Sequence, residues 1–184
     1  MSDPNDLAAF LKEAWDHLRN GVADAQAPAR LLSFATVSPD GRPEVRTVAL
    51  RAVDPVQAVL EVHTDLVTPK VASLRSTPIA ALHAWIAPAE VQIRASARVD
   101  ILSGDAVESQ WVAVPSASRV SYGTIPDPGQ PIDAAFEYDK PADRNRFAVL
   151  RCALTEIDLV HLGPRHHRAI YVSQDDWRGS WVAP

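Results

Sequence analysis

The chain has 184 residues, of which 47% are hydrophobic and 22% charged, so it is long enough for one buried core but short for two. We therefore expect a single domain over residues 1–184. A net charge of −5 excludes the uniform positive field that drives non-specific nucleic-acid binding, and no apolar run approaches the about 18 residues of a membrane-spanning helix.

The N-terminus and the cysteine content indicate the compartment. MSDPNDLAAF is acidic and lacks the basic start and apolar stretch of a secretory signal, so we expect a cytoplasmic protein without a membrane partner. The single cysteine, Cys152, excludes an intramolecular disulfide and cannot alone form a thiolate metal site. We expect it to be a small buried residue on a strand.

The chain opens with a helix signal. Asp3 reads as an N-cap and Pro4 as the first helical residue, followed by the second acid Asp6. Apolar residues then recur at helical spacing, which predicts a helix within residues 1–25 that packs on a larger body. The predicted stripe consists of Leu7, Phe10, Leu11, Ala14, Leu18 and Val22.

Three β segments follow. Residues 31–38 and 43–53 flank the tight turn Pro39–Arg42, which predicts a hairpin, and residues 58–64 add a third strand, as in a meander. Thr68-Pro69-Lys70 then resembles another helix start, with Thr68 as the cap and Pro69 in the first position, and the helix should run to about Ser76.

The second half predicts further strands separated by one helix and a long loop. In residues 91–102 polar and apolar residues alternate, which fixes a buried face. Residues 103–114 read as a helix capped by Ser103, and residues 115–141 as mostly loop. The remaining β segments are 79–86, 146–162, 166–173 and 180–184. The expected fold is mainly β with peripheral helices: roughly six or seven antiparallel strands that form a barrel, with two or three helices inserted.

Arg46 and Arg51 are the most informative charged residues. They flank an apolar run on one strand and, five residues apart, point to opposite faces, so burying either of them requires an anion. The open alternative is that both are hydrated or paired with nearby acids. Thr68 and Lys70 favour an anion, because a helix N-terminus with a hydroxyl and an ammonium suits a phosphate monoester.

Other candidate residues give weaker signals. Gln92 can donate to and accept from the edge of a flavin or nucleobase. The run Arg165–Arg168 is either a solvated basic turn or a site for an anionic substrate or cofactor. It lacks the helical His pair or Cys spacing of a metal site, so we expect no metal. Glycine-rich nucleotide loops and a nucleophile elbow are absent, so nucleophilic catalysis has no support.

The order of these motifs over residues 30–184 resembles the pyridoxamine 5'-phosphate oxidase superfamily, in particular its branch of related FMN-binding proteins. The family pattern A-T-V-x-x-D-G-x-P appears as residues 35–43 and is followed by the strand from Arg46 to Arg51. The phosphate loop appears as residues 63–70, the glutamine strand as residues 92–97, and the ending as residues 177–184.

The resemblance implies a six-stranded antiparallel split β-barrel that binds FMN, and it assigns site residues. It implies a substrate site at Arg165 and His167, the remnant of an R-x-H motif. Three departures stand out: His63 replaces a tyrosine, Pro69 a phosphate-binding arginine and Val160 a tryptophan near the flavin. The FMN-binding residues that it implies are Arg46, Thr47, Val48, Ala49, Leu50, Arg51, His63, Thr64, Thr68, Lys70, Gln92 and Arg168.

The resemblance also implies the activity and the assembly. We expect FMN-dependent hydride transfer with a small-molecule substrate, in a homodimer that holds each FMN at the subunit interface. The departures from the oxidase pattern lead us to expect slow or no oxidation of pyridoxamine 5'-phosphate. The alternatives are a flavin- or haem-binding module without turnover and a deazaflavin-dependent reductase.

Overall fold

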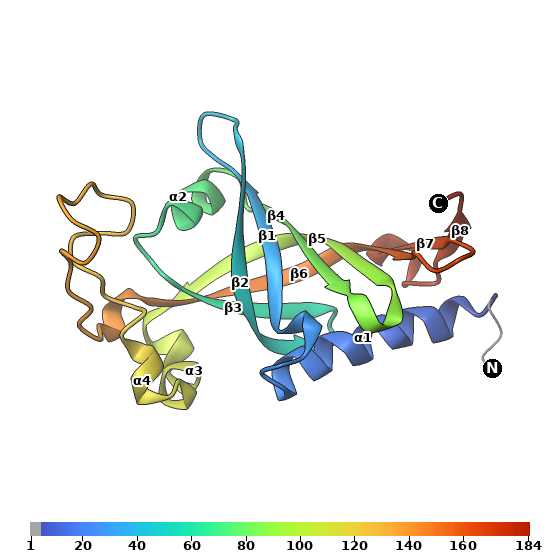
Figure 1. Cartoon of the computed structure of the whole chain (residues 1–184), viewed down its shortest axis with the longest axis horizontal. Helices are drawn as coiled ribbons and strands as arrows, with labels where there is room; N and C mark the ends of the chain where they lie inside the picture. The colour runs from blue at the N-terminus through green and yellow to red at the C-terminus, as the bar shows by residue number, and fades with distance from the viewer. Residues whose placement is uncertain (1–4) are drawn as a thin grey trace.

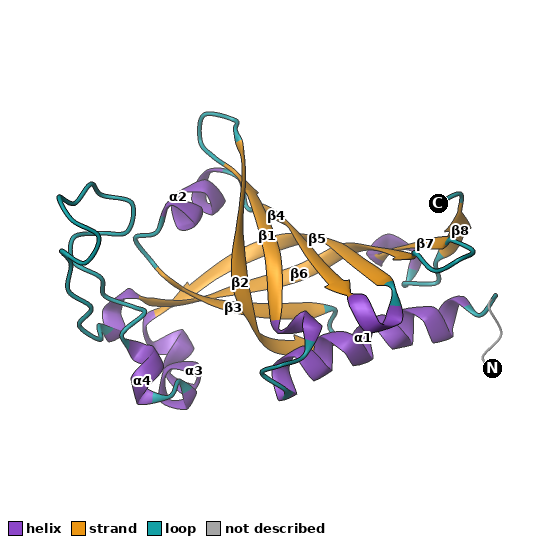
Figure 2. Ribbon diagram, in the orientation of Figure 1, coloured by secondary structure: helices purple, strands orange, loops and turns teal. Residues whose placement is uncertain are grey.

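The computed structural model describes residues 5–184, and its centre is a closed antiparallel barrel (Figure 1; Figure 2). The strand order is β3-β2-β1-β4-β5-β6, and pairing of β3 with β6 closes the barrel. The predicted six-stranded barrel and its initial meander are therefore confirmed. The barrel strands are β1 (Leu31–Val37), β2 (Pro43–Asp54), β3 (Val59–Asp65), β4 (Ile79–Ile86), β5 (Val91–Ser103) and β6 (Phe147–His161), and β7 (His167–Val172) and β8 (Ser180–Val182) extend the sheet beyond it.

Buried and more exposed residues alternate along the strands, so the sheet has an inner face and an outer face. On β5 the buried residues Val91, Ile93 and Ala95 belong to the main core, whereas Gln92 and Arg94 lie on the outer face. Cys152 on β6 is also fully buried, as expected, and burial raises the pKa of its thiol to about 12. The inner face is thus a continuous apolar core, and polar groups on it stand out.

Helix α1 (Leu7–Ala23) lies along one side of the barrel (Figure 1). Its N-cap is Asp6, whose carboxylate accepts a 2.9 Å bond from the Ala9 N–H. The predicted start at Pro4 is wrong, because Asn5 precedes the helix; Asp3 and Pro4 themselves lie outside the described residues. The buried face includes Trp15, which the predicted stripe omits. No helix within residues 5–184 is long and apolar enough to cross a bilayer.

The segment after β5 differs from the predicted helix. A 3-10 turn at Gly104–Val107 precedes α3 (Glu108–Ala113), and the Ser103 side chain makes no capping bond. Gly104 has a φ of +64°, a conformation that breaks a regular helix start at this point. Together with α4 (Ser116–Arg119), α3 covers a second, smaller core, made by Val107, Val114, Tyr122, Phe147 and Val149.

The barrel is split between β2 and β3. The two strands pair only from Leu50 to Asp54, with a register shift between Leu50 and Ala52, so residues 43–49 have a strand partner only in β1. On the other side of the split, residues 63–65 pair only with β6. Helix α2 (Pro69–Ser76) packs beside this opening, where the Ser73 hydroxyl donates to the Glu44 carboxylate at 3.2 Å. The split is the feature that positions the candidate site.

Candidate functional site

The N-terminus of α2 presents unpaired donors beside the split. Thr68 occupies the N-cap position and Pro69 the first helical position, as the sequence predicts. The Thr68 hydroxyl donates to the Asp65 carbonyl at 2.7 Å instead of capping the helix. Within the described part of the chain no acceptor is recorded for the Lys70 N–H, so this helix end can bind an anion.

Lys70 places a half-buried ammonium in the same position. Its Nζ donates to the Thr64 hydroxyl at 3.1 Å, and the hydroxyls of Thr64 and Thr68 lie 3.3 Å apart. Burial lowers the pKa of Lys70, and the charge of Arg46 lowers it further, although Asp65 acts in the opposite direction. No carboxylate among residues 5–184 forms an ion pair with Lys70, so the site favours an incoming anion.

Arg46 lies on the inner face of β2, near Lys70. Its guanidinium donates to the Thr36 hydroxyl at 2.8 Å and to the Phe34 carbonyl at 3.1 Å, and it pairs with the Glu44 carboxylate at 3.0 Å. Pairing with a nearby acid, the alternative left open by the sequence, therefore holds for Arg46. Glu44 is matched by Arg46 and Asp65 by Arg146, whereas Lys70 has no ion-pair partner among the described residues, so a net positive charge remains beside the split.

The backbone of β2 adds a row of hydrogen-bonding groups. Because residues 43–49 pair only with β1, alternate residues direct their N–H and C=O groups into the split. Thr47 and Ala49 belong to this stretch, and their side chains lie on the outer face, away from Arg46. Such an edge can bind the polar rim of a flat heterocycle.

Arg51 and His63 lie together in a separate hollow. As predicted, Arg51 faces away from Arg46; it lines a cavity of about 260 Å³ with His63, Gln110 and Val114. Burial lowers the pKa of His63 to about 4, with a smaller contribution from Arg51, and its buried Nδ1 has no hydrogen-bond partner. Neutral His63 thus offers an unused polar atom to this hollow.

Gln92 and Arg168 lie on the outer face of the sheet and not beside Lys70. Gln92 pairs with Val160 across the ladder, and Val160 pairs with Arg168. The Arg168 guanidinium donates two bonds, at 2.9 and 2.8 Å, to Asp158, which is only 2% exposed and also lies 3.4 Å from Arg94. One chain therefore does not bring all the predicted FMN residues together.

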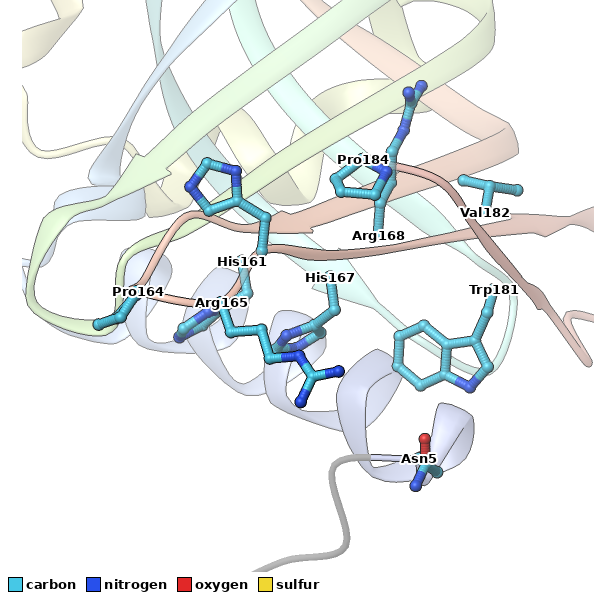
Figure 3. Close-up of a pocket in the computed structure, with 10 residues that line it drawn as sticks. Asn5, His161, Pro164, Arg165, His167, Arg168, Trp181, Val182 and Pro184 are labelled. Atoms are coloured by element: carbon cyan, nitrogen blue, oxygen red, sulfur yellow. The ribbon is translucent and has the colours of Figure 1, made fainter.

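Arg165 and His167 lie near the turn that joins β6 to β7, in a cavity that Arg168 also lines (Figure 3). They line a cavity of about 750 Å³ beside α1 and the C-terminus. The His167 ring stacks on His161 at 4.7 Å and contacts Phe10 and Trp181 at 5.0 and 5.7 Å. The aromatic contacts fix the His167 ring, whereas Arg165 is exposed and open to a ligand.

Sequence reasoning missed two carboxylates that organise these sites, Asp65 and Asp158, and the cation Arg146 that pairs with Asp65 at 2.9 Å. A detectable signal existed for Asp158, since an acid inside an apolar strand pattern must have a partner. Within residues 5–184 no group of three or more side chains has the composition of a metal site.

Comparison with known proteins gives a family match. The family model described as pyridoxamine 5'-phosphate oxidase, FMN-binding domain, matches residues 12–103, which is half of the chain. The pyridoxine/pyridoxamine 5'-phosphate oxidase 2 of Arabidopsis thaliana is 25% identical over 65% of this chain and 66% of its own length. Other curated oxidases of this name are matched over about half of their length.

Two solved structures share the fold over nearly the whole chain. A pyridoxamine 5'-phosphate oxidase-related, FMN-binding protein from Nostoc punctiforme has a TM-score of 0.77 and 24% identity, covering 94% of this chain and 96% of that one. PhzG from Burkholderia lata, in complex with tetrahydrophenazine-1-carboxylic acid, has a TM-score of 0.74 and 19% identity, covering 100% and 95%. At these identities the likeness establishes the split-barrel fold.

The lowered pKa of His63 predicts a pH dependence of stability. Between about pH 6.5 and about pH 4 the unfolded chain binds a proton at this residue and the folded chain does not, so the free energy of unfolding falls as the pH falls through this window. His63→Gln should flatten this part of the curve, measured as the urea midpoint against pH. The same change at the exposed His166 is the control; equal slopes in the wild type and H63Q would contradict the assignment.

Proposed function

Because this chain belongs to the pyridoxamine 5'-phosphate oxidase FMN-binding family, we propose that it binds FMN and is an oxidoreductase acting on a small molecule. The observation that carries the proposal is the half-buried pair of cations beside an open helix N-terminus: Arg46 is paired with Glu44, and Lys70 has no ion-pair partner among the described residues. When bound, FMN supplies hydride transfer, and the protein supplies binding and orientation.

The donors around α2 fit a phosphate monoester. Lys70 and Arg46 provide charge, the hydroxyls of Thr64 and Thr68 provide neutral hydrogen bonds, and the Lys70 N–H adds a backbone donor. Burial and, to a smaller extent, the charge of Arg46 lower the pKa of Lys70, and a phosphate dianion would offset the repulsion between the two cations. Riboflavin, which lacks the phosphate, could not do so, and FAD does not end in a monophosphate.

The open edge of β2 is the proposed seat of the flavin ring. Thr47, Val48 and Ala49 lie in the stretch that pairs only with β1, and the backbone groups that this stretch directs into the split suit the polar edge of the ring; Leu50, which pairs with Val62, bounds the opening. Arg51 and His63 lie on the other side of β2, in the hollow formed with α3, where they would face the far side of the ring. The ring would thus be held chiefly by backbone atoms.

Gln92 and Arg168 belong to this site only if a second copy contributes them. They lie on the outer face of the sheet, where β1, β2 and β4 also expose apolar side chains, a surface of the kind that mediates association. The exposed apolar residues of this outer face are Leu31, Val37, Val45, Ile79 and Trp85. We therefore propose a homodimer that packs outer face on outer face and holds each FMN at the interface.

The proposed substrate carries an anionic group. Arg165 is exposed in the cavity of about 750 Å³ and can form a charge-assisted hydrogen bond with a phosphate or carboxylate, while His167 is held in place to orient it. Val160, in place of a tryptophan, leaves the wall next to Arg168 without a large aromatic ring. These departures favour a substrate other than pyridoxamine 5'-phosphate.

The first test is cofactor preference. FMN should bind more tightly than riboflavin or FAD in fluorescence titrations, and Lys70→Ala or Arg46→Ala should weaken FMN by about 1.5–3 kcal/mol and leave riboflavin unchanged. Affinity for FMN should also fall as the pH rises through the lowered pKa of Lys70, where the ammonium is lost. Arg75→Ala, at the last turn of the same helix, is the control. Riboflavin binding as tightly as FMN would sink the phosphate site.

The second test concerns assembly. Val45→Glu places a charge on the outer face, at a side chain that is 69% exposed, and should give a monomer with weakened FMN binding. Val56→Glu, at a 94% exposed valine outside this face, is the matched control and should remain dimeric. Light scattering measures the mass of each variant. A wild-type monomer that binds FMN fully would refute the proposed interface.

The third test concerns the substrate. Peroxide release by FMN-saturated protein with pyridoxamine 5'-phosphate should be slow or absent, since the oxidase's tryptophan is replaced by Val160. Arg165→Ala should lower turnover of the natural substrate without changing FMN affinity, because Arg165 lies apart from the α2 donors. Rapid turnover of pyridoxamine 5'-phosphate that is lost in R165A would instead identify a vitamin B6 oxidase.

A further inference from the structure

The segment between α4 and β6, residues 121–143, forms a strap at the split end of the barrel (Figure 1). Ile125 and Asp139 exchange two backbone hydrogen bonds of 2.9 and 2.8 Å, which close the strap on itself. Its first residues include the buried Tyr122, whose ring packs on Phe147 at 4.9 Å, but most of its other residues are exposed, so beyond Tyr122 its attachment to the barrel depends on a few polar contacts.

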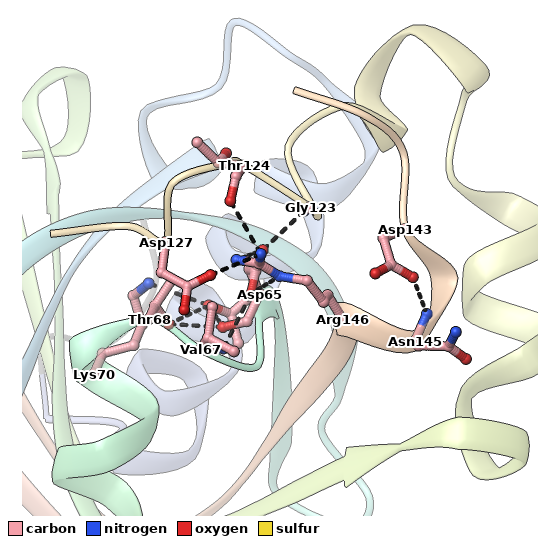
Figure 4. Close-up of polar contacts among 11 residues, drawn as sticks. Asp65, Val67, Thr68, Lys70, Gly123, Thr124, Asp127, Asp143, Asn145 and Arg146 are labelled. Atoms are coloured by element: carbon pink, nitrogen blue, oxygen red, sulfur yellow. Dashed lines mark hydrogen bonds and ion pairs between the residues drawn. The ribbon is translucent and has the colours of Figure 1, made fainter. Parts of the chain in front are cut away.

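One guanidinium provides most of this attachment (Figure 4). Arg146 pairs with the Asp65 carboxylate at 2.9 and 3.1 Å, and its remaining nitrogen donates to the Thr124 carbonyl and to the Asp127 carboxylate, both at 3.0 Å. Asp65 belongs to the end of β3, whereas Thr124 and Asp127 belong to the strap. Arg146 therefore joins the strap to the turn that precedes α2.

Asp65 in turn shapes the residues that carry the proposed phosphate donors. Its carboxylate accepts from the Val67 N–H at 3.0 Å and from the strap's Gly123 N–H at 2.8 Å, and its carbonyl accepts from the Thr68 hydroxyl at 2.7 Å. Asp65 is 3% exposed, so this network lies out of water. The geometry of Thr68 thus depends on a carboxylate that Arg146 holds.

The strap also passes directly over the start of α2. A methyl group added at Gly129 would lie 3.5 Å from Pro69 Cγ, and Pro69 is the residue before Lys70. Gly123 has a φ of +131°, and a Cβ there would collide with the Pro141 carbonyl, so the strap enters this region by a path that requires glycine.

Arg146 is not itself a free cation for an anionic ligand. It is matched by two carboxylates, Asp65 and Asp127, whereas Lys70 has none among the described residues. Its Nε donates to Asp65 and its Nη1 to Thr124 and Asp127, so one planar guanidinium fixes the relative position of two segments. A role in positioning therefore fits Arg146 better than a role in binding the phosphate.

We propose that Arg146 is a positioning residue for the cofactor phosphate: through Asp65 and Asp127 it clamps the strap to the turn of residues 64–70, and the clamp sets the affinity for the phosphate group. This inference rests on the proposed FMN function and assigns a role in it to Arg146, which lies 81 residues from Asp65 in the sequence. Loosening the strap should lower the affinity for the phosphate group of FMN and leave the contacts to the flavin ring unchanged.

The test compares FMN with riboflavin in three variants. Arg146→Met should raise the dissociation constant of FMN by about tenfold or more and leave that of riboflavin unchanged, and Arg146→Lys should restore part of the loss. Asp127→Asn removes only the exposed ion pair between Asp127 and Arg146, so the chain keeps its fold even if R146M does not. This variant should raise the dissociation constant of FMN about two- to fivefold. Asp133→Asn, an exposed acid of the same strap, is the control.

A second measurement tests whether the clamp holds the strap in place when no cofactor is bound. In the FMN-free protein, amide hydrogen exchange at Gly123 and Val67 should be faster in D127N and R146K than in D133N. Unchanged exchange, or an unchanged preference for FMN over riboflavin in the clamp variants, overturns the clamp while the proposed function stands. A wild type that binds FMN and riboflavin equally overturns the phosphate site, and the inference with it.

Discussion

The candidate site depends on the point at which β2 and β3 part. Residues 63–65 of β3 continue beyond its last partner in β2, but the ladder between the two strands ends at Leu50, next to the register shift between Leu50 and Ala52, and β2 then pairs with β1 alone. The gap leaves backbone groups of residues 43–49 without a strand partner and gives α2 a place to present its N-terminus. A fully paired barrel would have neither the open edge nor room for the donors of Lys70.

The electrostatics of the opening follow from how few acids it contains. The chain carries a net charge of −5, yet the two acids near the opening are already paired: Glu44 with Arg46, and Asp65 with Arg146. The pKa of Lys70 is lowered first by its burial and then by the neighbouring charge of Arg46. Local folding thus concentrates positive charge at one place in an acidic protein, which composition alone could not indicate.

Local patterns in the sequence predicted local structure well. The alternation of residues 91–102 predicted the two faces of β5, and Thr68-Pro69 predicted the start of α2. The predicted helix start at Ser103 was wrong, and the α-helix begins only at Glu108, because Gly104 takes a positive φ, which a pattern of side chains does not reveal. The clamp of Asp65 and Arg146 could not be predicted, since it joins residues that only the closure of the barrel brings together.

The predicted site residues were assigned to a single binding site, but a sheet has two faces, and the structure distributes them over both. Arg46 and Lys70 lie at the inner side of the split, whereas Gln92 and Arg168 lie on the outer face, and no rotamer change carries a side chain through a sheet. In the proposed homodimer a twofold axis packs outer face on outer face and brings Gln92 and Arg168 of one copy beside the split of the other, so the one interface completes two equal sites. In that arrangement the ion pair of Arg168 with Asp158 keeps the guanidinium ordered at a surface that is solvated in the isolated chain and covered in the dimer.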